Sequence, residues 1–162
     1  MKLISTESSR PRAEQAPPPA RRKQVDMAYF ALELSAGLGR HLEIETLIDH
    51  FSRRVGEVLP HDSLSFRHEL AGDWRVIAHG SGGRHACSYE LKVEDMPLGT
   101  LRITRRQRFE ESELARLEQL VGVLVYPLRN ALLYRRAQYD AATDPLTGLS
   151  NRGVFDDALP RE

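Results

Sequence analysis

The sequence has a single cysteine, Cys87, among its 162 residues. One thiol excludes an internal disulfide framework and a cysteine-rich metal cluster within this chain, and it fits a reducing compartment. The chain also has no run of 18 apolar residues, and its first residues hold no apolar segment of the length that a secretory signal needs. We therefore expect a cytoplasmic protein without a membrane-spanning segment.

An excess of charge of either sign is also missing, because 23 Lys and Arg residues balance 23 Asp and Glu residues. A neutral chain has no global field that would attract nucleic acid or acidic lipid, so we expect neither as a partner. Its length suits one domain of ordinary size with extensions.

Residues 1–23 contain little that could be buried. They hold Pro11, Pro17, Pro18 and Pro19, and they end in the basic run 21–23. Such a segment cannot offset the entropy lost on ordering, so we expect a disordered tail. A basic arm that binds a polyanion is the alternative, and a solvated leader is the favoured interpretation.

Two segments follow in which apolar residues recur every three or four positions, the spacing of an amphipathic helix. The first begins at Gln24 and ends at Gly37 and Gly39. The second begins after Leu42 and stops at Pro60. The sequence predicts two consecutive helices.

The period then changes to two, which indicates strands. A glycine-rich loop is expected at 79–84 and a turn at 96–99. Two hairpins result, with strands near residues 64–70, 74–78, 89–93 and 101–103. The predicted order of elements is two helices, about four antiparallel strands and a long helix. This order predicts an α+β fold with the helices on one face of the sheet.

Three aromatic residues on the predicted strands, Phe66, Trp74 and Tyr89, are candidates for lining a small-molecule pocket. Aromatic side chains on a sheet face under helices usually belong to the core, and this is the favoured interpretation. We keep them as pocket candidates because a large ring can serve either purpose.

His79, His85 and Cys87 lie close together in the sequence and carry donors that suit zinc or iron. Without a fourth donor they are weak evidence, so we expect no metal and incidental histidines on a loop. A reactive Cys87 would need a neighbouring base, and a half-buried structural thiol is favoured over an enzyme acting through it. The chain shows no phosphate-binding glycine loop and no nucleophile–base pattern, so no catalytic residue is assigned.

The segment 110–142 predicts one long helix of about 50 Å at 1.5 Å per residue. Pro127 lies inside it and should bend it, and two helices broken near Pro127 are the alternative. Apolar residues at alternating steps of three and four form one seam, which we expect to pair with a second copy in a homodimer. The seam comprises Leu114, Leu117, Val121, Leu124, Leu128 and Ala131.

The helix leads into Asp144-Pro145-Leu146-Thr147-Gly148-Leu149-Ser150-Asn151-Arg152. This motif resembles the D-x-L-T-G-L-x-N-R opening of GGDEF domains, the catalytic domains of bacterial diguanylate cyclases. The resemblance implies an entry motif made of Asp144, Leu146, Thr147, Gly148, Leu149, Asn151 and Arg152. In the family the metal-binding and base-reading residues lie further on, in an aspartate-bearing strand and the GG[DE]EF hairpin, and these 162 residues contain neither. GTP and Mg²⁺ are therefore expected only in the cyclase domain that would follow.

A second resemblance covers about residues 25–135. The runs 34–48, 62–66 and Pro97-Leu98-Gly99-Thr100-Leu101 are similar to the helix and strand framework of GAF domains. A PAS domain or another sheet-and-helix sensor is the alternative. Where ligand-binding GAF domains carry a long segment over the pocket, this chain has only the region 79–87, which argues against a large ligand.

These expectations divide the chain into a tail (1–23), a GAF-like sensor core (24–108), a long helical linker (109–143) and the start of a GGDEF domain (144–162). The expected function is the regulatory and dimerising region of a diguanylate cyclase, without catalytic residues or a cofactor of its own. The alternative is a freestanding ligand-binding or protein-interaction module.

Overall fold

The computed structural model describes residues 26–142. The predicted tail at 1–23 and the entry motif at 144–152 lie outside the described residues. Three helices and four strands follow one another in the described part. They are α1 (Met27–Leu38), α2 (Ile44–Val58), β1 (Ser63–Leu70), β2 (Asp73–Gly80), β3 (His85–Val93), β4 (Met96–Arg105) and α3 (Glu111–Ala142).

The strands form one antiparallel sheet in the order β2-β1-β4-β3. Two hairpins, β1–β2 and β3–β4, are joined through their inner strands, so that Phe66 of β1 lies between Ile77 and Leu101. This arrangement confirms the predicted α+β class with an antiparallel sheet and a long C-terminal helix.

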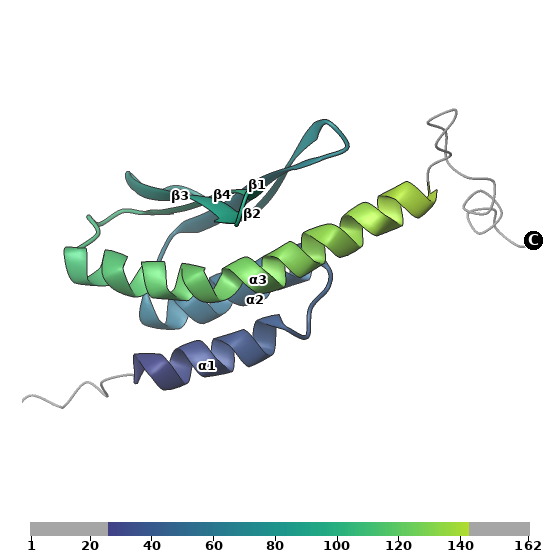
Figure 1. The fold of residues 1–162 in the computed structure, drawn as a ribbon. Helices are drawn as coiled ribbons and strands as arrows, with labels where there is room; N and C mark the ends of the chain where they lie inside the picture. The colour runs from purple at the N-terminus through teal and green to yellow at the C-terminus, as the bar shows by residue number, and fades with distance from the viewer. Residues whose placement is uncertain (1–25, 143–162) are drawn as a thin grey trace, which may run out of the picture.

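The helices lie on one side of the sheet (Figure 1). α2 and α3 contact the strands, and α1 packs against α2 and α3. Alternate residues of the inner strands point into this layer, because successive side chains of a strand face opposite sides. Fully buried side chains from α2, β1, β4 and α3 form one core with α1, and each contributes about 1.5–3 kcal/mol of hydrophobic stabilisation. The largest include Phe51, Phe66, Leu34, Leu64, Ile103 and Leu117.

The two N-terminal helices agree with the sequence prediction. Asp26 caps α1, because its carboxylate accepts hydrogen bonds from the backbone N–H groups of Ala28 (3.0 Å) and Tyr29 (3.3 Å). Gly39 follows the last turn. α2 buries Leu47, Phe51 and Val55 on one side and ends before Pro60, which cannot continue a helix.

The predicted turn at 96–99 is wrong, because these residues begin β4. The chain reverses just before β4, between Val93 and Met96, where Glu94 has a φ of 53°. Gly99 lies within strand β4 and not in a turn. Its φ is 137°, and a Cβ there would lie 2.2 Å from the carbonyl oxygen of Arg67, so glycine permits the close approach of β4 to β1.

The other face of the sheet carries no helix from the described part of the chain (Figure 1). Trp74 and Val76 point to this face, since they pair with Glu69 and Arg67 rather than with the inward-facing Phe66. Trp74 is 59% exposed, so the expectation that it belongs to the core is wrong. The prediction assumed that every strand turns its large residues toward the helices. Alternation along a strand does not show which of its two faces the helices cover, so the exposure of Trp74 could not be predicted.

α3 is continuous over 32 residues with Pro127 inside it, so the alternative of two separate helices is wrong. The helix axis changes direction in its middle (Figure 1), as expected where a proline removes one backbone hydrogen bond. No helix between residues 26 and 142 is both long enough and apolar enough to cross a membrane.

Candidate functional site along helix α3

One face of α3 completes the core of the chain. Leu117, Leu124, Leu128 and Ala131 have no exposed surface, and Val121 is nearly buried. These residues belong to the seam that the sequence assigned to a dimer, in which Leu114 is half-buried. The interpretation as an intermolecular seam is therefore wrong for the buried residues, because their surface is already used within the chain. Spacing reveals an apolar stripe but not the partner that covers it.

The opposite face and the far end of α3 are open. Tyr126 is 64% exposed and Leu133 is 43% exposed. No residue from Leu133 to Ala142 is buried, and this part of the helix extends past the sheet (Figure 1). α3 thus has an inner half that belongs to the core and an outer part that projects from it.

Arg105 fixes the start of α3. Its guanidinium forms a two-pronged ion pair with Glu113, with Nη1 2.9 Å from Oε1, and also donates to the backbone carbonyls of Gln107 and Arg108. It lies over the ring of Phe109 at 4.3 Å. The hydrogen bonds from Arg105 hold the pKa of Glu113 below its ordinary value, and the same bonds raise the pKa of Arg105. Both groups are therefore charged at neutral pH.

Arg135 ties the projecting part of α3 to the start of α2. Its Nη2 atom donates to Glu43 at 3.1 Å and also to Glu45. Hydrogen bonding to Glu45 raises the pKa of Arg135, so the guanidinium remains charged. The carboxylates are about half exposed, and such pairs contribute at most about 1 kcal/mol. The contact is therefore weak enough to open readily.

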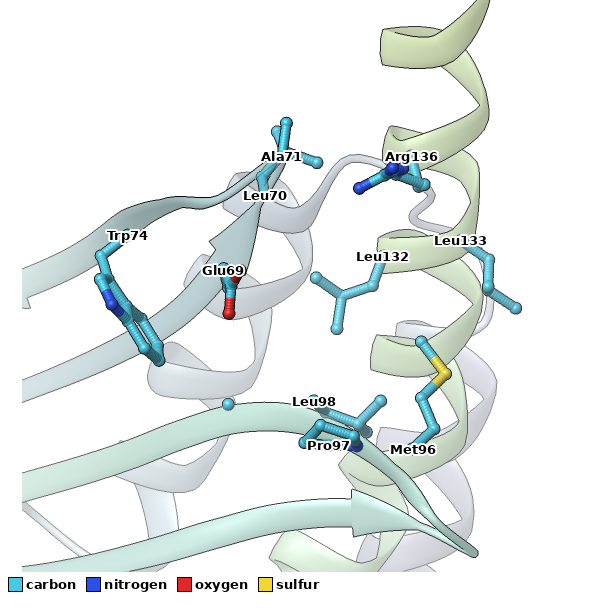
Figure 2. A pocket seen from close by; sticks show the side chains of 11 residues that line it. Glu69, Leu70, Ala71, Trp74, Met96, Pro97, Leu98, Leu132, Leu133 and Arg136 are labelled. Atoms are coloured by element: carbon cyan, nitrogen blue, oxygen red, sulfur yellow. The ribbon is translucent and has the colours of Figure 1, made fainter.

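A cavity of about 400 Å³ lies between α3 and the ends of the two hairpins (Figure 2). Figure 2 shows Leu132 pointing from α3 into this space, while Arg136 extends toward the β1–β2 turn. The volume is within the range of small-molecule sites, and the wall is mostly apolar with a few polar groups, as in such sites. The lining residues are Glu69, Leu70, Ala71, Trp74, Met96, Pro97, Leu98, Gly99, Leu132, Leu133 and Arg136.

Of the three predicted pocket residues, only Trp74 lines this cavity. Phe66 is fully buried beneath the helices. Tyr89 is half-buried against the same core, and burial, with smaller effects of Cys87 and Glu118, raises its pKa to about 12. The structure therefore does not bring the three aromatic residues together, because Trp74 faces the other side of the sheet from Phe66 and Tyr89.

Cys87 is half-buried on β3, with its sulfur 3.8 Å from the carbonyl oxygen of Ile103. Burial raises the pKa of the thiol, so it is protonated and a poor nucleophile at neutral pH. Between residues 26 and 142 no group of three or more His, Cys, Asp and Glu side chains is placed to hold a metal ion. His79 instead lies 3.6 Å from Asp49 of α2.

Sequence reasoning missed the contacts that hold the outer part of α3. Arg135 lies about 90 positions from Glu43 and Glu45, and each of the three matches an ordinary solvated charge. Leu132 and Pro97 likewise carry no signal of a cavity before the hairpins are placed against α3.

The chain was compared with known protein families and with curated proteins, and neither comparison finds a match.

Proposed function

We propose that the chain is the GAF-like sensory and dimerising region of a diguanylate cyclase, which controls a GGDEF domain through α3. The resemblance of residues 144–152 to a GGDEF opening supports the catalytic partner, and the succession of helices and strands supports the sensor. The observation that carries the proposal is the division of α3 into an embedded inner half and a projecting outer part beside a cavity.

Leu132, Leu133 and Arg136 line the cavity from α3, at the point where the helix leaves the core. A small apolar ligand bound there would contact the hairpin ends and the helix together. A ligand that binds better to one position of α3 than to another would increase the population of the position that it prefers. The outer part would carry that shift toward residue 142 and the domain that follows.

The proposal includes a homodimer, since two cyclase domains must meet to join two GTP molecules into cyclic di-GMP in the family. The available surface is not the buried seam. It is the exposed apolar residues of α1 and α3, which lie side by side and run in the same direction (Figure 1). Tyr29 and Leu32 of α1 and Tyr126 of α3 are each more than half exposed. A second copy is the proposed occupant of this surface.

In this proposal GTP and Mg²⁺ bind only to the cyclase domain, and the described residues supply signal input and symmetry. A cytoplasmic location belongs to the proposal as well, and the single cysteine supports it.

The decisive experiment extends the chain past Glu162 with its own coding sequence and measures cyclic di-GMP formed from GTP. A GG[DE]EF segment in the extension and turnover by the purified protein would support the proposal. A stop codon directly after Glu162, or an extended protein that is inactive although folded and dimeric, would contradict it.

The dimer is tested separately by light scattering. Leu32→Glu with Tyr126→Glu should halve the mass, while Arg102→Glu on the exposed sheet face should leave it unchanged. An unchanged mass in the double variant would remove this surface from the proposal.

The cavity also favours a second candidate, a freestanding ligand-binding module. Ligand binding with no effect on turnover in the extended protein would support that candidate over the first.

A further inference from the structure

A second cavity, of about 480 Å³, lies on the other side of Leu70. It is lined by residues from the start of α2, the β1–β2 hairpin and the outer part of α3, and it shares only Leu70 with the cavity of Figure 2. Unlike that cavity, it is bordered by several charged and hydrogen-bonding side chains. Its lining residues are Glu45, His68, Leu70, Arg75, Val76, Ile77, Arg135, Gln138 and Tyr139.

His68 is an unusual residue for the wall of this cavity. It is only 2% exposed, and its Nδ1 atom has no hydrogen-bond partner among residues 26–142. The ring stacks on Phe66, with the centroids 5.5 Å apart. Burial lowers the pKa of His68, so the imidazole is neutral at pH 7 and offers one donor and one acceptor. Buried polar atoms are nearly always paired, so this side chain points to a missing partner.

The two arginines of the wall keep unused donors. Arg135 engages Glu43 and Glu45 through Nη2 alone, which leaves Nε and Nη1 without a partner in the described part of the chain. Arg75 lies 3.7 Å from Asp73, beyond hydrogen-bonding distance, and both side chains are mostly exposed. A planar guanidinium with free N–H groups recognises carboxylates and phosphates.

The rest of the wall narrows the choice of anion. Glu45 places one negative charge in the cavity, and Glu43 accepts a hydrogen bond from the same Nη2 atom of Arg135 as Glu45 does. A second charge on the ligand would therefore add repulsion, which favours a monoanion over a phosphate dianion. Leu70 and Ile77 offer an apolar surface for the body of the ligand, and Gln138 and Tyr139 offer neutral hydrogen-bonding groups.

We propose that this cavity binds a small organic carboxylate with an apolar body. The carboxylate lies between Arg75 and Arg135, and the body lies against Leu70 and Ile77 beside the His68 ring. Because the ligand takes donors of Arg135, it competes with Glu43 and Glu45 for this guanidinium. The inference goes beyond the proposed function, since it concerns a second cavity and requires no cyclase domain.

The test uses the 162-residue chain and benzoate as the probe. The imidazole signals of His68 are followed by NMR during the titration and are assigned from their loss in His68→Gln. If that variant does not fold, contacts with Phe66 assign them instead. Benzoate should shift these signals with saturation, and neutral benzamide should not. Calorimetry then measures the affinity.

Arg75→Gln is the informative variant because Arg75 is exposed and its carboxylate partner, Asp73, lies 3.7 Å away, beyond hydrogen-bonding distance. It should weaken benzoate binding by about tenfold or more, as expected for the loss of a charge-assisted hydrogen bond. Arg136→Gln is the matched control, since Arg136 lines the other cavity, and it should leave the affinity unchanged. No shift of His68, an equal affinity in Arg75→Gln, or a response to inorganic phosphate alone would overturn the proposal.

Discussion

The guanidinium of Arg135 lies 3.1 Å from the carboxylate of Glu43 and connects the outer part of α3 to the residue that precedes α2. The contact joins segments that are about 90 residues apart in the chain. It is positioned just where α3 stops contributing buried residues, since Leu132 is the last of them. This ion pair is therefore a determinant of where the outer part of α3 lies.

Arg135→Gln should loosen the outer part of α3 without unfolding the domain. The ion pairs are partly exposed, so the loss of global stability should be a few tenths to about 1 kcal/mol. Amide hydrogen exchange should nevertheless accelerate within residues 133–142. Arg136→Gln is the control, because Asp140 on the same helix is the only ion-pair partner of Arg136 among residues 26–142. Equal exchange in the two variants would show that the contacts with Glu43 and Glu45 do not hold the helix.

Leu124 and Leu133 test which face of α3 belongs to the core. Leu124 is fully buried, and Leu124→Ala should cost about 2–5 kcal/mol of unfolding free energy through the cavity it creates. Leu133→Ala makes the same chemical change at an exposed position and should cost less than about 1 kcal/mol. Urea denaturation followed by circular dichroism measures both. Similar costs would contradict the described packing of α3.

The variant Leu124→Glu distinguishes two interpretations of this residue. Leu124 is buried either in the core of its own chain or in an intermolecular seam, as the sequence predicted. A charge at this fully buried position lacks a partner in the core, so the variant should unfold. A folded monomer, seen by light scattering together with a native circular dichroism spectrum, would restore the intermolecular seam.

Glu113→Gln should destabilise the chain by about 1–3 kcal/mol, because it weakens the charge-assisted hydrogen bonds of the nearly buried Arg105. Hydrogen bonding to Arg105 lowers the pKa of Glu113 from 4.5. A carboxylate whose pKa is lower in the folded state stabilises the protein above its unfolded pKa, and this contribution is lost as the pH falls through the folded pKa. The wild type should therefore lose stability below about pH 4.5 more steeply than the variant. Parallel curves of stability against pH for the two proteins would contradict this.

Trp74 is the only tryptophan and lines the cavity of Figure 2, so its fluorescence should report on a ligand there. An apolar ligand that displaces water from the ring should move the emission to shorter wavelength. Leu132→Trp should fill part of the cavity and weaken binding of the same ligand, and Leu42→Trp, at an exposed leucine that does not line the cavity, is the control. Because the new tryptophans would mask the signal, calorimetry measures these affinities. Equal affinities in the two variants would place the ligand elsewhere.

The order and approximate extent of the elements could be predicted from the sequence because each has a local signal. Gly39 follows α1, Pro60 follows α2, and alternation along β1 separates Phe66 from Arg67. These signals depend on neighbouring residues alone. The turn before β4 was misplaced because Pro97 and Gly99 are common turn residues, whereas here Gly99 is needed for a close contact between strands.

The candidate site could not be predicted in the same way, since it depends on contacts between distant segments. Leu132 meets Pro97 and Leu70 only after both hairpins are placed against α3. Trp74 and Phe66 both match a strand pattern, and only the pairing register reveals that they face opposite sides of the sheet. Periodicity likewise detects the stripe on α3 but does not distinguish a second copy from the chain's own core.

Pro127 makes α3 a helix that can bend at a defined point. A proline leaves the carbonyl of Val123 without its usual backbone donor, so the helix is weakest in bending at this point. Ala142 lies 15 residues beyond Pro127, about 22 Å at 1.5 Å per residue, and residues 133–142 of this stretch project from the core. A small rotation about this pivot, applied near Leu132, becomes a displacement several times larger at Ala142. Pro127→Ala, which restores the missing backbone donor, would therefore stiffen the helix and reduce the displacement at Ala142 without altering what the cavities bind.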